Sequence, residues 1–266
     1  MKSVSVKTAQ EIEYLRENNQ LVAKTLAYLA SLIEPGVQTK VLDLKAEEFI
    51  RDHGALPGFK GYEGFPFTLC ISVNDVVVHG FPSEYVLKEG DIVSVDCGTF
   101  MHGFFGDSAY TFPVGEISSE NRELLRTTKD SLNLAIAKIA PSCRIGDIGA
   151  TIQEYAESRG YGIVREMVGH GLGRDMHEEP EVPNYGRRGH GKMLIPSLVL
   201  CIEPMVTMGK RNIFVEKDGW TIRTVDHKNA AHFEKAIFIR QDGTAEELTS
   251  YTEIEATLKE KGVWVS

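Results

Sequence analysis

Cysteine is scarce in this sequence, and no two cysteines form a C-x-x-C pair. The four that occur are separated by long and irregular spacings: Cys70, Cys97, Cys143 and Cys201. Such spacing fits neither a disulfide framework nor a zinc ribbon, because both need a more regular pattern of cysteine pairs. The sequence therefore predicts reduced thiols and a reducing compartment.

Long apolar runs and an excess of positive charge are also missing. No apolar run reaches the roughly 18 residues of a membrane span, and residues 1–19 lack the apolar core of a signal peptide. The net charge of −9 leaves no surplus of basic residues for binding nucleic acid or an anionic membrane. We therefore expect a cytoplasmic protein that binds neither.

Hydrophobic spacing predicts an α+β protein. Apolar residues recur at helical intervals over 8–32, and Thr8 with Glu11 has the pattern of an N-terminal capping box. The same reasoning predicts helices over 38–53, 119–140, 146–159 and 251–260, and strands over 68–73 and 75–79. A β-hairpin is predicted over 91–100 and 104–112, followed by strands and loops through most of 162–240.

Residues 33–54 resemble residues 139–160. The positions that match at a constant offset include Ile33 and Ile139, Pro35 and Pro141, Glu48 and Glu154, and Gly54 and Gly160. Two explanations stay open, because unrelated helical hairpins also share helix breakers and apolar spacing. An internal duplication predicts two α/β halves, about 8–112 and 119–240, within one domain over 1–266.

Two acidic residues, Asp96 and Asp107, lie in the predicted hairpin. If Met101 and His102 form a two-residue turn, the two acids lie directly opposite each other, with Cβ atoms about 5 Å apart. Apolar neighbours such as Val95 indicate a largely buried sheet, where two like charges repel strongly. A divalent cation between the carboxylates would remove that repulsion. The alternative is an acidic pair that faces solvent.

Three further polar residues interrupt apolar segments: Glu203 in LVLCIEPMV, Glu234 in AAHFEKAIFI and His170 in VGHGLG. A lone charged group in such a run is rarely buried unless it is paired or bound to metal. The combined set could hold two divalent cations about 3.5–4 Å apart, as in two-metal hydrolases. Its oxygen-rich ligands suit Mn²⁺, Fe²⁺ or Co²⁺ at least as well as Zn²⁺, and the lack of cysteine ligands argues against structural zinc.

Longer motifs connect this set to a family. VVVHGFP, DIVSVDCGTFMHGFFGDSAYTF, GHGLGRDMHEEPEVPNY, CIEPM and AAHFEKA resemble the methionine aminopeptidases of the pita-bread fold, in their bacterial, type I form. The resemblance covers nearly the whole chain. It implies two pseudo-symmetric α/β halves around a central antiparallel sheet. It also implies a metal-dependent hydrolase that removes the initiator methionine from new proteins and prefers a small second residue.

The resemblance also implies the metal ligands. Asp96 would chelate one metal ion, Asp107 and Glu234 would bridge both, and His170 and Glu203 would hold the second. Glu203 would in addition carry a proton from the attacking water to the leaving amine. Without the resemblance, each of these residues alone is weak evidence, because buried histidines and carboxylates are often simply hydrogen-bonded.

Two more histidines match roles outside the metal site. His79 resembles the family's histidine that contacts the substrate near the scissile bond, and His177 resembles the one that stabilises the oxyanion. Without the resemblance, His79 would be a histidine beside a turn. His177 would then be a surface histidine next to Glu178.

The resemblance further implies an apolar pocket for the methionine side chain. Its lining would be Phe59, Tyr62, Phe65, Cys70, Met176 and Trp220. Phe59 stands where a cysteine is frequent in the bacterial enzymes, Phe65 where a tyrosine is frequent, and Met176 where a phenylalanine is frequent. All three are apolar, so we expect the preference for methionine to hold. Ordinary core packing is the alternative explanation.

The main rival is an Xaa-Pro aminopeptidase or prolidase of the same fold, which shares the five ligands but normally carries a large N-terminal domain. Glu203 and Glu234 are too close in sequence for the insertion of the type II methionine enzymes. A non-catalytic relative would usually have lost ligands. The implied partner is the N-terminal methionine of nascent polypeptides, the expected state is a monomer, and contact with the ribosome stays open.

Overall fold

The computed structural model describes residues 4–263. Its helices are α1 (Ala9–Leu32), α2 (Thr39–Asp52), the short 3₁₀ helix η1 (Tyr62–Gly64), α3 (Ser119–Ala137), α4 (Ile145–Glu157) and α5 (Thr252–Glu260). These confirm the predicted helices to within a few residues at each end. Within residues 4–263, no helix has both the length and the apolar character needed to cross a membrane.

Over residues 4–263 the strands form four sheets, and all their pairings are antiparallel. The first contains β1 (Leu56–Pro57), β2 (Leu69–Val73), β4 (Ile92–Met101) and β5 (Phe104–Pro113); the second contains β6 (Gly162–Ile163), β10 (Met205–Thr207) and β13 (Ala230–His232). The third contains β3 (Val76–Val78), β11 (Ile213–Val215) and β12 (Ile222–Thr224); the fourth contains β7 (Gly169–Gly171), β8 (Glu178–Val182), β9 (Val199–Ile202), β14 (Lys235–Ile239) and β15 (Ala245–Glu247).

Helix α1 begins as its sequence predicts. The Thr8 hydroxyl accepts a hydrogen bond from the backbone of Glu11, whose carboxylate accepts one from the backbone of Thr8. The apolar stripe of the helix, including Leu15 and Leu26, is fully buried. This stripe packs the helix across strands β4 and β5, and it therefore fixes the position of the hairpin.

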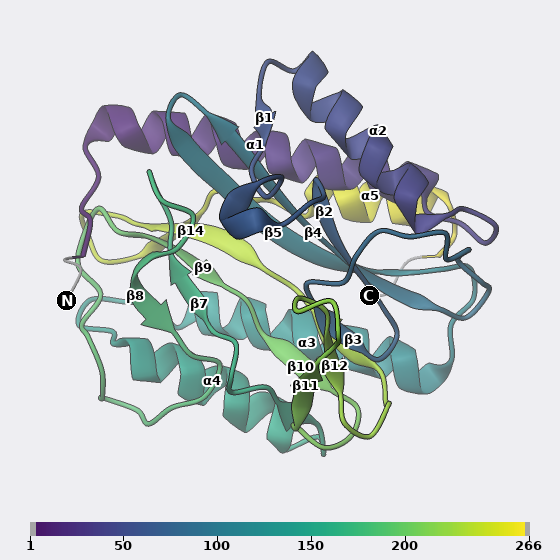
Figure 1. Ribbon diagram of the computed structural model, residues 1–266. Helices are drawn as coiled ribbons and strands as arrows, with labels where there is room; N and C mark the ends of the chain where they lie inside the picture. Colours follow the sequence, from purple (N-terminus) through teal and green to yellow (C-terminus); the bar gives the residue numbers. More distant parts are fainter. Residues whose placement is uncertain (1–3, 264–266) are drawn as a thin grey trace.

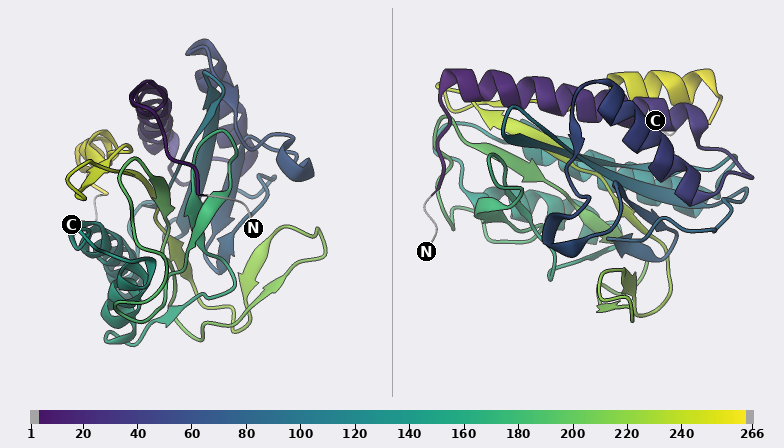
Figure 2. Two further views of the ribbon diagram at one scale, coloured as in Figure 1. Left: turned by 90° about the vertical axis from the view of Figure 1, so that its left-hand side faces the viewer. Right: turned by 45° about the horizontal axis from the view of Figure 1, so that its top comes forward.

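Four of the five α-helices of the described residues lie along one side of the strands (Figure 1 and Figure 2), and α2 packs near β1 and β2. In Figure 1, α1 and α5 lie along the upper edge and α3 and α4 along the lower edge, with β4, β5, β9 and β14 between them. In the end-on view of Figure 2, these helices lie to the left of the strands, and the β11–β12 hairpin projects at the lower right.

The hairpin is shifted relative to the predicted register. Its turn consists of His102 and Gly103, both with positive φ (57° and 80°), because Met101 pairs with Phe104. Asp107 therefore lies opposite Gly98, and Asp96 lies opposite Ala109. The prediction that the two acids lie directly opposite each other was wrong. They are diagonal neighbours, and because the shift is two residues they still share a face.

The two similar segments have matching local structure. Gly54 and Gly160, which follow α2 and α4, both have positive φ (78° and 83°). The residues before the two helices also match, because Gln38 and Arg144 each form an isolated antiparallel bridge, to Val86 and Met193 respectively. These features agree with the similarity of the two segments in sequence. That this similarity comes from an internal duplication stays a prediction.

Candidate active site

A single cavity of about 260 Å³ collects the residues that the sequence singled out. Its lining includes the predicted ligands Asp96, Asp107, His170, Glu203 and Glu234, the histidines His79 and His177, and the pocket residues Phe59, Tyr62, Phe65, Cys70, Met176 and Trp220. These side chains come from strands, loops and turns that are far apart in sequence. Their proximity is a product of the fold, while their roles stay predictions.

Strand pairing explains how the acids meet. Asp96 lies on β4 directly opposite Cys70 on β2, so both side chains point to the same face. Asp107 follows on β5 as the diagonal neighbour of Asp96. Glu203 stands just after β9, and Glu234 stands between β13 and β14. The pairing of β9 with β14 brings the last two acids to the hairpin.

Hydrogen bonds from outside the cavity hold the backbone near two of the acids. The backbone N–H of Asp107 donates to Asn19 Oδ1 on α1 (3.0 Å), and Asn19 is fully buried. The backbone N–H of Glu234 donates to the carbonyl of Ala109 (2.9 Å). The Tyr251 hydroxyl contacts both this carbonyl and that of Glu234 (2.8 and 2.6 Å). The acids are therefore positioned by the scaffold.

The four carboxyl groups are buried close together, and this raises their pKa values. Burial raises the pKa of Asp96 to about 7 and that of Glu203 to about 8. Burial also holds the pKa of Asp107 and of Glu234 well above the ordinary range, and neighbouring carboxylates add to the effect. Without a cation, these groups would resist ionising together.

Unsatisfied oxygen atoms point to what the cavity binds. Among residues 4–263, Asp96 Oδ1, Asp107 Oδ1 and Glu234 Oε1 are buried without a hydrogen-bond partner. Buried oxygens of this kind are normally paired or bound to metal. His170 adds a nitrogen ligand, because Nδ1 donates to the Gly171 carbonyl (3.0 Å) and leaves Nε2 to face Glu203 Oε1 at 3.6 Å. The donor set fits divalent cations.

Two residues that were not predicted from the sequence, Cys201 and His232, lie beside the predicted metal ligands. The potential ligand atoms of Asp107, His170, Cys201 and Glu234 all lie within 4.8 Å of one another. The sequence predicted no cysteine among the metal ligands, whereas Cys201 Sγ lies within reach of them. His232 is the second, because its Nε2 lies 3.6 Å from Glu203 Oε2. Each stands two residues before a predicted ligand, a spacing that shares one face of a strand.

The two further histidines also line the cavity. His79 has a positive φ of 57°, a strained conformation that clusters at functional sites. Burial lowers the pKa of His79 to about 4, so its imidazole is neutral near neutral pH. His177 Nδ1 lies 3.1 Å from the Tyr62 hydroxyl, and its ring stands edge-on to that of His170. Both imidazoles border the cavity that the acids line.

Aromatic rings form the apolar end of the cavity. Phe65 packs edge-to-face on Trp220, with ring centroids 5.2 Å apart, and Trp220 also faces His79. Phe59 and Tyr62 pack beside a buried cluster that contains Met176. Rings and sulfur give a soft apolar surface that suits a thioether side chain.

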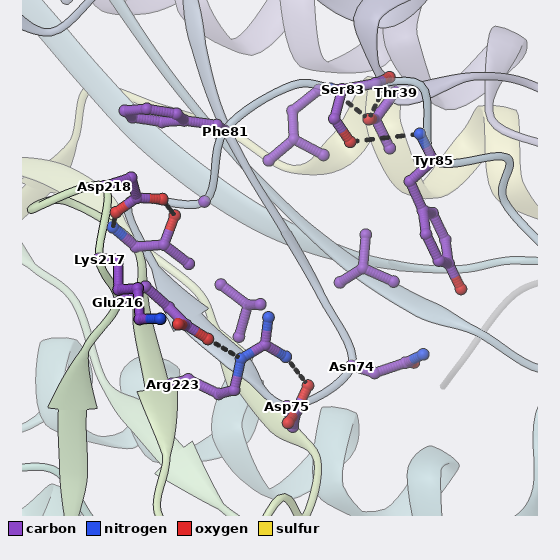
Figure 3. Close-up of a pocket in the computed structure, with 15 residues that line it drawn as sticks. Thr39, Asn74, Asp75, Phe81, Ser83, Tyr85, Glu216, Lys217, Asp218 and Arg223 are labelled. Carbon is purple, nitrogen blue, oxygen red and sulfur yellow. Dashed lines mark hydrogen bonds and ion pairs between the residues drawn. The ribbon is translucent and has the colours of Figure 1, made fainter.

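A second cavity of about 440 Å³ is lined in part by residues on either side of Trp220 in the sequence, among them Asp218 and Thr221 (Figure 3). Three of its charged residues interact with one another: Arg223 contacts both Asp75 and Glu216, as the dashed lines show. Asp218 accepts hydrogen bonds from the backbones of Trp220 and Thr221 (2.8 Å each). This network holds the turn that carries Trp220, and so it supports the first cavity.

Comparison with known proteins gives a consistent result. The model of metallopeptidase family M24 matches residues 13–241. The methionine aminopeptidase of Clostridium acetobutylicum is 48% identical over 241 residues, covering 90% of this chain and 96% of that protein. Methionine aminopeptidase 1 of Bacillus subtilis is 46% identical over 237 residues, covering 89% of this chain and 96% of that protein.

Solved structures of methionine aminopeptidases are also similar to this chain. The methionine aminopeptidase of Thermotoga maritima has a TM-score of 0.91 at 43% identity, covering 93% of this chain and all of that chain (100%). The Xaa-Pro dipeptidase of Bacillus anthracis has a TM-score of 0.75 at 23% identity, covering 92% of this chain and 62% of that chain, and shows the fold alone. These likenesses confirm the predicted pita-bread fold.

Proposed function

The chain belongs to metallopeptidase family M24 and acts as a methionine aminopeptidase, and we propose that its reaction takes place among the five buried ligand residues. The observation that supports this site is the group of buried, unpartnered carboxylate oxygens beside His170. We infer two divalent cations there, from Mn²⁺, Fe²⁺, Co²⁺ or Zn²⁺. Asp107 and Glu234 would bridge them, Asp96 would bind one, and His170 with Glu203 the other.

Bound cations would supply positive charge that polarises the peptide carbonyl and makes a nearby water more acidic. Glu203 would accept the proton of that water and deliver it to the leaving amine. His177, which lines the cavity, would donate a hydrogen bond to the developing oxyanion. His79 would contact the peptide beside the scissile bond.

The aromatic end of the cavity would hold the methionine side chain. Phe59, Phe65 and Trp220 would enclose it, and Tyr62, Cys70 and Met176 would complete the wall. The three departures from the bacterial pattern keep this wall apolar. A long unbranched side chain would therefore still be preferred, while the depth of the pocket would differ from that of the relatives.

We extend the proposal to the cellular role. The substrate would be the initiator methionine of nascent polypeptides, followed by a small second residue. The protein would work in the cytoplasm, as the reduced cysteines suggest, and it would be a monomer, as the family leads us to expect. Contact with the ribosome would need a local basic patch, because the net charge is −9.

The direct test is methionine release from Met-Ala-Ser by the purified protein. The assay would contain Mn²⁺ or Co²⁺, then a chelator, with Ala-Pro peptides alongside. We expect release that depends on the metal and little cleavage before proline. Cleavage only of Xaa-Pro bonds would move the assignment to the prolidase side of the fold. Metal binding without any cleavage would indicate a binding protein.

A further inference from the structure

The imidazole of His232 is buried beside the proposed site, but the ligand set does not use it. Only 2% of the residue is exposed, and among residues 4–263 its Nε2 is one of the few buried polar atoms without a hydrogen-bond partner. A buried donor or acceptor left unpaired costs about 1–3 kcal/mol. An unpaired nitrogen at this place is therefore unfavourable for stability, which suggests that it has a role in function.

The backbone of His232 is held firmly. It pairs with Met205 in the β10–β13 ladder. Its N–H donates to Thr111 Oγ1 (2.9 Å), and the Thr111 hydroxyl donates to its carbonyl (2.7 Å). Thr111 lies on β5, the strand that also carries Asp107. The imidazole therefore projects from a fixed point of the same scaffold that positions the acids.

Glu203 lies between two imidazoles. His170 Nε2 is 3.6 Å from Glu203 Oε1, and His232 Nε2 is 3.6 Å from Glu203 Oε2. The two rings differ in their other contacts. The Nδ1–H of His170 is committed to the Gly171 carbonyl, which leaves its Nε2 as a metal-binding lone pair. His232 Nε2 faces the carboxylate oxygen on the other side, where a proton donor fits.

We propose that His232 is a positioning residue that donates an Nε2–H hydrogen bond to Glu203 Oε2 and fixes the orientation of that carboxylate. This inference rests on the proposed function, in which Glu203 carries the proton. A gap of 3.6 Å is longer than a formed hydrogen bond of about 2.7–3.2 Å. A small rotation of either side chain closes it. With Oε2 fixed, Oε1 remains on the side of His170 and the cations.

Three substitutions of His232 separate positioning from other roles. His232→Gln places an amide N–H near the position of Nε2, whereas His232→Asn reaches only the position of Nδ1. His232→Leu removes the donor. The measurements are kcat and KM for Met-Ala-Ser, Mn²⁺ binding by calorimetry, and the melting temperature. The Gln–Asn pair decides the question even if the Leu variant fails to fold.

We expect His232→Leu and His232→Asn to lower kcat about 10–100-fold, the usual effect of losing such a partner. KM and Mn²⁺ stoichiometry should stay near wild type, Mn²⁺ affinity should fall by no more than kcat does, and His232→Gln should restore most of both. Equal losses in Gln and Asn would overturn the proposal, as would loss of one Mn²⁺ equivalent in all three variants, which would make His232 itself a ligand. Wild-type protein that releases no methionine would instead overturn the proposed function, and this inference with it.

Discussion

The ring of Phe59 lies directly over the backbone of Gly98 on strand β4. A methyl group added at Gly98 would come within 2.4 Å of Phe59 Cε1 and 2.7 Å of Cδ1. Gly98 also lies opposite Asp107 in the hairpin. This glycine therefore permits the close contact between the metal-binding hairpin and one wall of the apolar pocket.

Gly98→Ala should narrow the apolar end of the cavity. Its methyl group must displace the Phe59 ring, and overpacking of this kind costs about 1–3 kcal/mol. We expect KM for Met-Ala-Ser to rise by roughly tenfold, equivalent to about 1.4 kcal/mol of lost binding. Steady-state kinetics measures the change. Adding Phe59→Leu should recover much of it, and a double variant no better than the single would refute this explanation.

Glu203→Gln should nearly abolish turnover in a folded protein. The amide has similar size but cannot take up a proton, so kcat should fall about 10²–10⁴-fold. Methionine release and thermal melting would be measured together. Glu63→Gln is the matched control, because Glu63 lines the same cavity but is an exposed residue with no assigned role. Wild-type activity in the Glu203 variant would refute the proposed site.

Much of this architecture follows from local sequence. The capping pair Thr8 and Glu11 marks the start of α1, and polar residues in apolar runs mark Glu203 and Glu234. The hairpin register does not follow locally. His102 adopts a positive φ, which is uncommon for a residue other than glycine, so the turn falls one residue later than predicted.

The missed residues have a different cause. Cys201 and His232 each precede a predicted acid by two residues, so period-two spacing could have placed both on the ligand face. What local sequence cannot supply is the pairing of distant strands. The contact between His232 and Glu203 depends on the pairing of β10 with β13. The family resemblance named the ligands but not these neighbours.

Metal removal should make stability depend on pH. In the metal-free protein, the pKa of Asp96 is raised to about 7 and that of Glu203 to about 8. The folded state then holds these protons more tightly than the unfolded chain. Their contribution to stability is complete below about pH 4 and is lost as pH rises through about 7 and 8.

The measurement is the melting temperature with Mn²⁺ and with a chelator, from about pH 5.5 to about pH 8. Cations replace the protons, and at 100 times the dissociation constant they add about 2.7 kcal/mol. We expect a difference of roughly 5–10 °C near pH 8 that shrinks toward pH 5.5. A difference that stays constant with pH would contradict the proton competition.

Lys7→Met should loosen the loop that carries His177. Lys7 forms a buried ion pair with Glu178, whose Oε1 also accepts a hydrogen bond from the backbone of Arg174 (2.9 Å). The charged side chains are only 2% and 10% exposed. Removing one partner of such a pair leaves an unpaired buried charge and costs about 3–5 kcal/mol. The melting temperature should fall by about 10 °C, and kcat should fall because His177 lies in this loop.

Lys40→Met is the matched control for that variant. Lys40 pairs with Glu84 at the surface, where the side chains are 43% and 73% exposed, so its loss should cost no more than about 1 kcal/mol. If Lys7→Met behaved like this control, the loop would not depend on the buried pair. Adding Glu178→Leu to Lys7→Met should restore stability, because the unpaired charge is then removed. It should not restore kcat, because the backbone N–H of Arg174 then has no Glu178 carboxylate to donate to, and the loop that carries His177 stays loose.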